Sequence, residues 1–443
     1  MNQSFYIKTY GCQMNNYDSG KIDELLTYNG FNRVNDVENS DIAILNTCHI
    51  RQKASEKLYS DLGRLSIFKE NKNKLGKRMH IIVTGCVAQA EGDEIIKRNK
   101  SVDYVIGPQN FHVIPKLLKK NISNQVFTDF LCEEKFQSLP LSHTKDVSRL
   151  VTIQEGCDKF CSFCVVPYTR GAEYSRSVEE IYAEVLNYAK NNTSEITLLG
   201  QNVSSYRSEI FKNSKSEKVD LGKLCNILST IPGIKRIRYL TSHPSDINNE
   251  LILEHKNNKS LMPFLHLPIQ SGSDQILKKM NRKHTKEDYL RIVNNIKKLV
   301  PKIAFSSDFI VGYPGETDSD FEETLDLVEK VGFASSYSFK FSARPGTPAS
   351  IKENLVSEST ASLRLLKLQN LLNKQQKDFN TSFIDKTVDV LISSKGKKIN
   401  QYVGRTPYLQ PVHVFSKKNL IGHILKIKIQ RLTSFSFHGK ILN

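Results

Sequence analysis

Short β-branched runs alternate with helix-like amphipathic stretches through the first 120 residues. The runs are expected to form strands at residues 5–10, 42–46, 81–84 and 102–106, followed by helices at 18–26, 52–65, 88–98 and 111–119. Strands joined through helices pair in parallel, because each crossover returns the chain to the same edge of the sheet. The pattern therefore predicts an open parallel α/β sheet over residues 1–120. No G-x-G-x-x-G motif follows the first strand, so the sequence does not support a nicotinamide cofactor.

A second, longer series of strands and helices begins near residue 150, in a domain expected to span residues 143–377. Before it, residues 121–149 lose the periodicity and are interpreted as a connection. The expected strands are at 150–154, 196–199, 237–241, 264–269, 304–311 and 337–341, and the helices include 178–190, 221–228, 286–299, 321–331 and 360–377. Six units are too few for a closed eight-stranded barrel and predict an open, partial (β/α)6 barrel. Catalytic groups should then gather at the carboxyl ends of its strands.

The chain changes character again from about residue 378. Short alternating runs at 388–392, 412–415 and 424–429 are interrupted by glycine and proline, and in ILKIKI the apolar residues fall on one face and the lysines on the other. This pattern predicts a small antiparallel β-barrel over residues 378–443. Such barrels often bind oligonucleotides through a basic face, and a merely solvated face is the alternative.

Positive charge is concentrated in this last segment. The 443 residues carry a formal net charge of +17, and residues 380–443 contain 11 Lys or Arg against 2 Asp or Glu, a net +9. A large positive excess is typical of proteins that bind polyanions, nucleic acid above all. A biased genome would explain the total charge equally well, because Lys, Asn and Ile are all abundant. The uneven distribution is what favours RNA binding at the C-terminal end.

The sequence indicates a cytoplasmic protein with no membrane segment. The apolar runs at 42–45 and 81–83 fall far short of the roughly 18 residues that suggest a membrane span. The opening residues MNQSFYIKTYGCQMNN lack the basic region, apolar run and cleavage site of a secretory signal. In a reducing compartment the eight cysteines are more plausible as metal ligands than as disulfides.

Three of the cysteines are clustered in the segment GCDKFCSFCVVPYTRG. Cys157, Cys161 and Cys164 have the spacing C-x3-C-x2-C, directly after the first strand of the second series. A 4Fe-4S cluster with three cysteine ligands keeps one iron open for a small molecule. The alternative is a structural zinc site, which prefers four closed ligands, and no fourth Cys or His lies close in the sequence. The spacing favours the open cluster.

Three other cysteines are far apart in the sequence. Cys12, Cys48 and Cys86 each stand at the carboxyl end of an expected strand, in KTYGC, ILNTC and VTGC. Because the carboxyl ends of parallel strands share one edge of a sheet, the three thiols are expected to converge on a second site. The alternative is that each is a small apolar residue packed at a strand end.

Several blocks of the sequence resemble the radical S-adenosylmethionine (SAM) superfamily and, within it, the MiaB-type tRNA methylthiotransferases. They are YGCQMNNYDS, NTCHIRQKASEK, GCDKFCSFCVVPYTRGAEYSR, LPIQSGSDQILKKMNR, DFIVGYPGET and FSARPGTPAS. The resemblance covers nearly the whole chain: residues 1–120 resemble the methylthiotransferase domain, 143–377 the radical SAM core and 378–443 the TRAM domain.

The resemblance implies two 4Fe-4S clusters and SAM as cofactors. Cys157, Cys161 and Cys164 would bind the cluster whose open iron holds SAM, and Cys12, Cys48 and Cys86 a second cluster that handles sulfur. No amino acid is assigned as a catalytic acid, base or nucleophile. Cys132 and Cys225 match no ligand position and are expected to be packed thiols.

The implied reaction is methylthiolation of carbon-2 of N6-isopentenyladenosine beside the anticodon of tRNA. Related enzymes act on threonylcarbamoyl adenosine or on an aspartate of a ribosomal protein. The stretch GCQMN at residues 11–15 resembles the enzymes that act on isopentenyladenosine rather than either of these. A non-catalytic iron–sulfur RNA-binding protein and a thiol oxidoreductase using Cys161 and Cys164 are alternatives of other classes. The implied partners of a monomeric enzyme are the tRNA anticodon loop, an electron donor such as flavodoxin or ferredoxin, and a sulfur donor.

Other residues in these blocks carry weaker indications. By resemblance, Gly200, Gln201, Asn202, Gln270, Ser271 and the GYPGET turn would lie near SAM, while Tyr168, Arg170 and Arg176 could meet nucleotide phosphate. Each has an ordinary alternative as a turn or surface residue, and Gly315 and Thr317 have a sufficient explanation in a tight turn and a helix N-cap.

Overall fold

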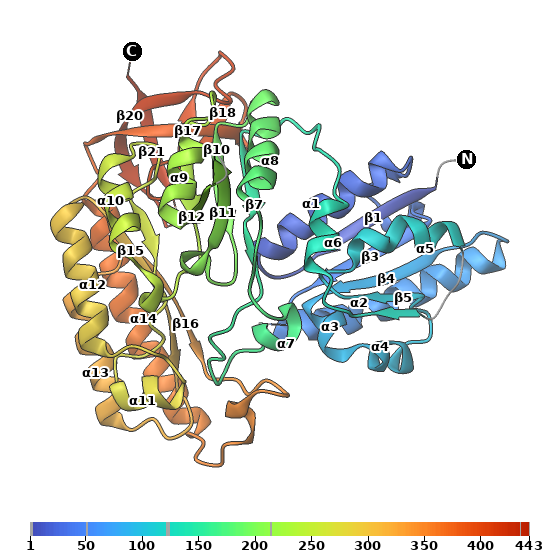
Figure 1. Cartoon of the computed structure of the whole chain (residues 1–443), viewed down its shortest axis with the longest axis horizontal. Coiled ribbons are helices and arrows are strands. Elements are labelled where there is room, and N and C mark those ends of the chain that lie inside the picture. Colours follow the sequence, from blue (N-terminus) through green and yellow to red (C-terminus); the bar gives the residue numbers. More distant parts are fainter. Residues whose placement is uncertain (1–2, 50–51, 121–124, 213–214, 435, 443) are drawn as a thin grey trace. The chain divides into compact units, whose positions relative to one another are not determined.

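The computed structural model describes residues 3–49, 52–120, 125–212, 215–434 and 436–442. The chain folds into two compact units (Figure 1). The first contains residues 1–142, 154–158 and 165–176, and the second contains 143–153, 159–164 and 177–443. No helix among the described residues is long and apolar enough to cross a membrane.

The first unit is built on a six-stranded sheet in which every neighbouring pair is parallel. Its strand order is β2-β1-β3-β4-β5-β6. The strands are β1 (Ser4–Thr9), β2 (Asn32–Arg33), β3 (Ile42–Thr47), β4 (His80–Gly85), β5 (Tyr104–Ile106) and β6 (Gln125–Phe127). Every residue of β3 and β4 is buried, as expected for central strands covered on both faces.

Helices cover both faces of this sheet. Helices α1 (Gln13–Tyr28) and α5 (Ile114–Lys120) pack with Phe5, Ile44 and Ile82. Helices α2 (Gln52–Lys74), α3 (Cys86–Glu91) and α4 (Asp93–Arg98) cover the other face. The sequence indicated one helix at 88–98, but Gly92, with φ +49°, divides it into α3 and α4.

The stretch at 121–149 holds more structure than a connection. Strand β6 extends the sheet, and α6 (Cys132–Gln137) follows it. These elements are too short to show a hydrophobic period. The short strands β8 (Gln154–Glu155) and β9 (Tyr174–Ser175) pair with each other, and helix α7 (Val166–Arg170) completes the first unit.

The second unit has six parallel strands in the expected order. Strands β7 (Ser148–Thr152), β10 (Glu195–Leu199) and β13 (Arg236–Tyr239) form one sheet, and β14 (Phe264–His266), β15 (Ala304–Val311) and β16 (Ser335–Lys340) form the other. A parallel bridge between Ile237 and Leu261 links the two. The partial (β/α)6 barrel is confirmed.

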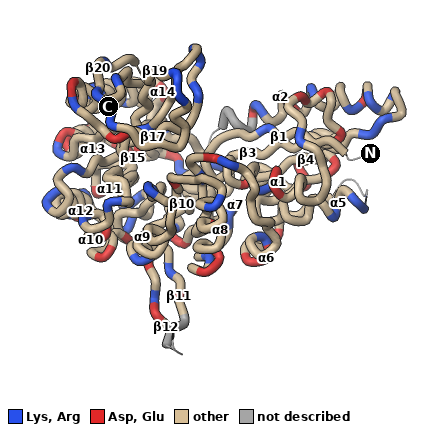
Figure 2. Tube along the Cα trace, turned by 90° about the horizontal axis from the view of Figure 1, so that it is seen from above, with Lys and Arg blue, Asp and Glu red and all other residues tan. Residues whose placement is uncertain are grey.

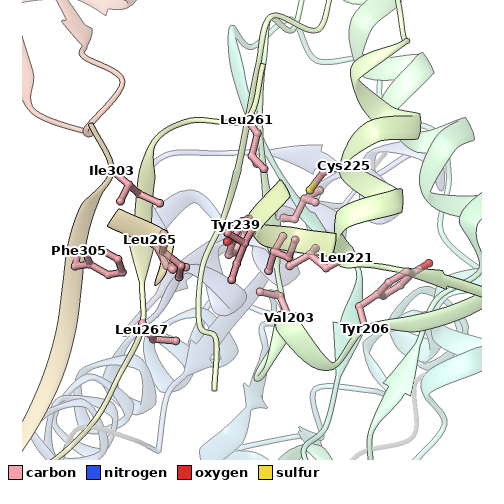
Figure 3. Close-up of a cluster of buried hydrophobic side chains, with 14 of the residues drawn as sticks. Val203, Tyr206, Leu221, Cys225, Tyr239, Leu261, Leu265, Leu267, Ile303 and Phe305 are labelled. Carbon is pink, nitrogen blue, oxygen red and sulfur yellow. The ribbon is translucent and has the colours of Figure 1, made fainter. Parts of the chain in front are cut away.

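The helices of this unit are α8 (Val178–Lys190), α9 (Leu221–Ser229), α10 (Asn249–Asn257), α11 (Asp274–Lys279), α12 (Lys286–Leu299), α13 (Asp318–Val331) and α14 (Glu358–Thr381). Tyr239, Leu265 and Phe305 share one hydrophobic core with residues from these helices (Figure 3). A hairpin of β11 (Arg207–Lys212) and β12 (Lys215–Asp220) projects from the unit (Figure 2). The six-fold pattern gave no sign of it.

The C-terminal segment forms a closed five-stranded barrel. Its strands are β17 (Thr387–Lys395), β18 (Gln401–Arg405), β19 (Pro411–Phe415), β20 (Ile424–Leu432) and β21 (Phe437–Ile441). One pair, β19 with β21, is parallel, because five strands in a ring cannot alternate direction throughout. Lys426 and Lys428 are exposed while Ile427 and Ile429 are buried, as the alternation predicts.

The barrel is anchored to the rest of the second unit by buried arginines. Arg236 of β13 donates hydrogen bonds to the carbonyls of Asp389 and Arg405. Arg238, on the same strand, donates to the carbonyls of Thr406 and Pro407. Both arginines are almost fully buried and lie near Glu195, which compensates their charge. The barrel therefore has a hydrophobic core of its own but is fixed to the rest of the second unit through these buried hydrogen bonds.

Candidate metal centres

The spaced cysteines follow three strands that are neighbours in the first sheet. The order β1-β3-β4 brings the carboxyl ends of these strands together, and Cys12, Cys48 and Cys86 are the next residues or lie just beyond. Thr47 and Gly85 are paired in register, so Cys48 and Cys86 leave the sheet side by side. We call these three residues the N-terminal thiol site.

Two glycines allow the close approach of this site's backbone. Gly11 has φ +104°, and a Cβ there would lie 2.1 Å from the Cβ of Cys48. Gly85 has φ +94°, and a Cβ there would lie 2.4 Å from the carbonyl oxygen of Thr47. Only glycine meets both the conformation and the lack of space. The glycines that precede Cys12 and Cys86 are thus structural requirements of the site.

The thiols of Cys12 and Cys86 experience different electrostatics. A hydrogen-bonding interaction with Cys48 is the largest influence on Cys12, and together with Arg170 and the backbone of Asn15 it outweighs burial and lowers the pKa of Cys12 to about 6. Cys12 is also the N-cap of α1, a position that stabilises a thiolate. Burial raises the pKa of Cys86, although the nearby Arg170 opposes this.

A buried ion network lies beside these thiols. It consists of Asp18, Lys135, Glu155 and Arg170, each at most 2% exposed. Arg170 Nη2 lies 2.7 Å from Asp18 Oδ2, Lys135 Nζ lies 3.0 Å from Asp18 Oδ1, and Glu155 pairs with both cations. The Gln109 side chain donates to the carbonyl of Arg170 at 2.8 Å. The network joins α1, α6, β8 and α7 within the first unit.

The donor set of the N-terminal thiol site suits an iron–sulfur cluster in its chemistry. Thiolate sulfur is the ligand of such clusters, and one of the thiols already has a lowered pKa. Across the described ranges, no three His, Cys, Asp or Glu side chains lie in an arrangement that could hold a metal ion. What the site does present is three thiols at one sheet edge and a buried donor, Arg170 Nη1, with no hydrogen-bond partner in the described part of the chain.

The clustered cysteines lie on a loop, residues 157–164, which we call the cysteine loop. Cys157 belongs to the first compact unit, and Cys161 and Cys164 belong to the second. In the second unit Ser162 anchors the loop: its N–H donates to the carbonyl of Met280 at 3.0 Å, and its hydroxyl lies 2.8 Å from that of Tyr313. Tyr313 belongs to the GYPGET turn, so this turn does adjoin the loop.

Arg282 contacts the cysteine loop directly. Its Nη1 lies 3.6 Å from the Sγ of Cys161, and its Nη2 donates to the carbonyl of Pro268 at 2.5 Å. Within the described ranges no carboxylate pairs with this guanidinium. His243 and His284 lie nearby, and burial followed by the charge of Arg282 lowers the pKa of His243 to about 2 and that of His284 to about 4. Arg282 is therefore a cation among neutral groups.

Other residues indicated by the sequence have structural roles. Arg170 is buried in the ion network, so its suggested contact with nucleotide phosphate is wrong. Arg176 is also buried, and its guanidinium lies over the Phe136 ring at 4.4 Å. Tyr168, in contrast, is 48% exposed. The side-chain Oδ1 of Asn202 accepts from the backbone N–H of His243. The Ser271 hydroxyl accepts from the N–H of Ser273 within a turn, and the Thr317 hydroxyl accepts from the N–H of Asp320 as the N-cap of α13.

The two cysteines outside both sets differ from each other. Cys225 is fully buried in the main core, as expected for a packed thiol (Figure 3). Cys132 lies at the start of α6, with its Sγ 3.9 Å from Glu155 Oε2.

The sequence gave no reason to single out Asn15 or to link Arg282 to a cysteine. Both lie within blocks that carry the resemblance, YGCQMNNYDS and LPIQSGSDQILKKMNR, and only their contacts distinguish them from their neighbours.

Family comparisons agree with this architecture. Residues 151–328 match the radical SAM superfamily, residues 382–442 match the TRAM domain, and residues 4–107 match a family described as "Uncharacterized protein family UPF0004". The radical SAM methyltransferase TsrM from Kitasatospora setae has a similar fold, with a TM-score of 0.57 at 12% identity, covering 79% of this chain and 75% of TsrM. The cobalamin-dependent radical SAM enzyme OxsB gives 0.54 at 14% identity, covering 84% and 56%.

Fold and family matches together define a radical SAM enzyme with a TRAM domain, which implies SAM and a 4Fe-4S cluster. A curated protein of Wolbachia pipientis subsp. Culex pipiens, "tRNA-2-methylthio-N(6)-dimethylallyladenosine synthase", is 53% identical over 419 residues, 93% of each chain. The chain belongs to the tRNA-2-methylthio-N6-dimethylallyladenosine synthase family of radical SAM methylthiotransferases. The resemblance seen in the sequence is confirmed.

Proposed function

We propose that this enzyme converts N6-dimethylallyladenosine, the isopentenyl nucleoside named above, into its 2-methylthio derivative in tRNA, beside the anticodon. The name of the Wolbachia relative supports this substrate. The observation that carries the proposal is the N-terminal thiol site. Radical generation needs one set of three cysteines, and a second set at a separate sheet edge is explained by sulfur handling.

Cys157, Cys161 and Cys164 are the proposed ligands of the SAM-binding cluster, and Cys12, Cys48 and Cys86 those of a second 4Fe-4S cluster. When bound, the clusters and SAM supply the radical, the sulfur and the methyl group that the unreactive C2–H bond requires. The protein's own residues hold and orient these groups. Ser162 and Tyr313 fix the cysteine loop, and Arg282 supplies a positive charge beside Cys161.

The barrel is the proposed anchor for tRNA. Its exposed lysines, among them Lys426 and Lys428, offer phosphate contacts, and Lys and Arg positions recur along the barrel's chain trace (Figure 2). Because Arg236 and Arg238 fix the barrel to β13 of the radical SAM core, a bound tRNA would be held at a constant position relative to that core. A single-stranded anticodon loop can release its adenosine from the stack more easily than a duplex.

A one-electron donor of the flavodoxin or ferredoxin type and a sulfur donor are further proposed partners of a monomeric enzyme. The threonylcarbamoyl and ribosomal-protein substrates are the alternatives within the methylthiotransferases. A non-catalytic iron–sulfur RNA-binding protein is excluded by membership in an enzyme family.

The test is nucleoside mass spectrometry of tRNA from cells with and without this gene. Loss of the 2-methylthio nucleoside with accumulation of the dimethylallyl precursor, reversed by the wild-type gene and not by a Cys161→Ala gene, is the expected result. An unchanged methylthio nucleoside would overturn the proposal, and loss of a threonylcarbamoyl derivative instead would favour the alternative.

A further inference from the structure

Arg170 is the cation of the buried ion network that faces the N-terminal thiol site. Helix α7, which carries it, packs against α3, which begins at Cys86. Asn15 connects Arg170 to Cys12: its Oδ1 lies 3.4 Å from Arg170 Nη2 and 3.6 Å from Cys12 Sγ. The guanidinium therefore lies beside two of the three thiols.

The donors of Arg170 are used unevenly. Nη2 donates to Asp18, whereas Nη1 is buried, makes no well-aligned hydrogen bond among the described residues and lies 3.3 Å from Glu155 Oε1. The guanidinium also interacts with the thiol of Cys86, where it opposes the effect of burial. A buried N–H is normally hydrogen-bonded with good geometry, so an acceptor better aligned than Glu155 is expected at this point. The thiols of Cys12 and Cys86 are the sulfur groups that this guanidinium adjoins.

The network is neutral by itself, because Asp18 and Glu155 balance Lys135 and Arg170. Its effect on a group held by the thiols therefore depends on which of its members lies beside them, and Arg170 is the cation that Asn15 connects to Cys12. Four buried charges are costly compared with apolar side chains of the same size. An interaction with the group held by the neighbouring cysteines would explain why four buried charges lie beside the N-terminal thiol site.

We infer that Arg170 is a positioning residue of the sulfur-handling site, whose Nη1–H donates to a sulfur of the group held by Cys12, Cys48 and Cys86. This rests on the proposed function. The donor and the positive charge stabilise the reduced, more negative state of that group and raise its reduction potential. Arg suits the role better than Lys because its planar fork can bind Asp18 with one nitrogen and the sulfur with the other.

Two matched double variants test this inference. Asp18→Asn with Arg170→Gln leaves the buried Lys135–Glu155 pair, and Asp18→Asn with Lys135→Gln leaves the buried Arg170–Glu155 pair. Both remove one cation and one anion from the same network, so neither leaves an uncompensated charge. Only the first removes the group beside the thiols.

Both are made in full-length protein with Cys157, Cys161 and Cys164 replaced by Ala, so that only the N-terminal thiol site can hold a cluster. Iron content and the midpoint potential, from an EPR-monitored redox titration, are measured on each. The variant lacking Arg170 should have a lower potential than the variant lacking Lys135 at equal iron content. Equal potentials would overturn the inference and leave the proposed function standing.

Two further outcomes are decisive. Absence of iron from the parent protein would overturn the second-cluster part of the proposed function together with this inference. If the double variants do not fold, Arg170→Lys alone, which keeps the charge but not the fork, should still lower the potential. An unchanged potential in this variant would count against the inference as well.

Discussion

Cys157, Cys161 and Cys164 stand close together on one loop, whereas Cys12, Cys48 and Cys86 come from three neighbouring strands of a sheet. The loop is anchored by hydrogen bonds of Ser162 with Met280 and Tyr313, and by one arginine that has no carboxylate partner in the described ranges. The N-terminal thiol site depends instead on strand order, on two glycines and on a paired ion network. Sites of similar composition can thus depend on quite different parts of the chain.

This difference predicts which substitutions should abolish the function of each cysteine site. A site whose ligands share one loop should lose function when a ligand or an anchor of the loop is removed, and should tolerate changes that leave the ligands and anchors in place. A site assembled at a sheet edge should also fail when its backbone packing is disturbed, with every thiol still in place.

The largest expected effect is at the cysteine loop. Cys161→Ala should abolish 5′-deoxyadenosine production under reducing conditions, because three thiolates are needed to hold the SAM-binding cluster. Chromatography of the reaction products measures this. Cys225→Ala, at a buried thiol in the core, is the control and should retain production. Normal production by the Cys161 variant would remove this loop from the mechanism.

A substitution at the sheet edge should impair the N-terminal thiol site and leave the cysteine loop functional. Gly11→Ala places a Cβ 2.1 Å from that of Cys48 at a φ of +104°, which should cost at least about 2 kcal/mol locally. The variant should lose about half of its iron, because each set of three cysteines would hold one of two 4Fe-4S clusters. SAM cleavage should be retained. Gly20→Ala is the control, because a Cβ there meets nothing within 4 Å. Full iron in the Gly11 variant would show that the thiol site does not need this packing.

Arg282 tests the loop's electrostatics. Arg282→Met removes the N–H donor to Cys161 and its charge, so SAM cleavage should slow by about tenfold, as for other partners of metal ligands. Arg282→Lys should recover part of the rate because it keeps the charge. Arg291→Met, at an exposed arginine on α12, serves as the control. Equal rates for the Met variant and the wild type would make Arg282 a purely structural residue.

The smallest effect is expected at the barrel. Deleting residues 378–443 would leave Arg236 and Arg238 without their carbonyl partners, so substitutions are the cleaner test. Replacing Lys417 and Lys418 with Gln should reduce the log–log salt slope of tRNA binding by about 1.4–1.8, if each contacts one phosphate. Lys256 and Lys259, outside the barrel, provide the control pair. A slope that does not differ from that control would exclude these two lysines from the tRNA contact.

Much of this architecture could be predicted because it follows from short-range patterns. The βα alternation gave the parallel sheet and the six-stranded series, and alternation in ILKIKI gave the inward face of β20. Strand ends gave the placement of Cys12, Cys48 and Cys86 at one edge of the sheet, since parallel strands share an edge.

Long-range pairing could not be predicted in the same way. Nothing local joins Asp18 to Lys135 and Arg170. Arg170 stands close to the clustered cysteines in the sequence, which is why it was expected to meet a nucleotide phosphate. The hairpin β11–β12 and strand β6 are too short or too polar to show a hydrophobic period.

The central claim is that the N-terminal thiol site handles sulfur independently of the cysteine loop. The direct test is a Cys12→Ala, Cys48→Ala, Cys86→Ala protein, with iron, 5′-deoxyadenosine and methylthio-nucleoside measured on one preparation. It should keep about half of the iron, cleave SAM and form no methylthio product. Full methylthiolation by this variant would contradict the claim.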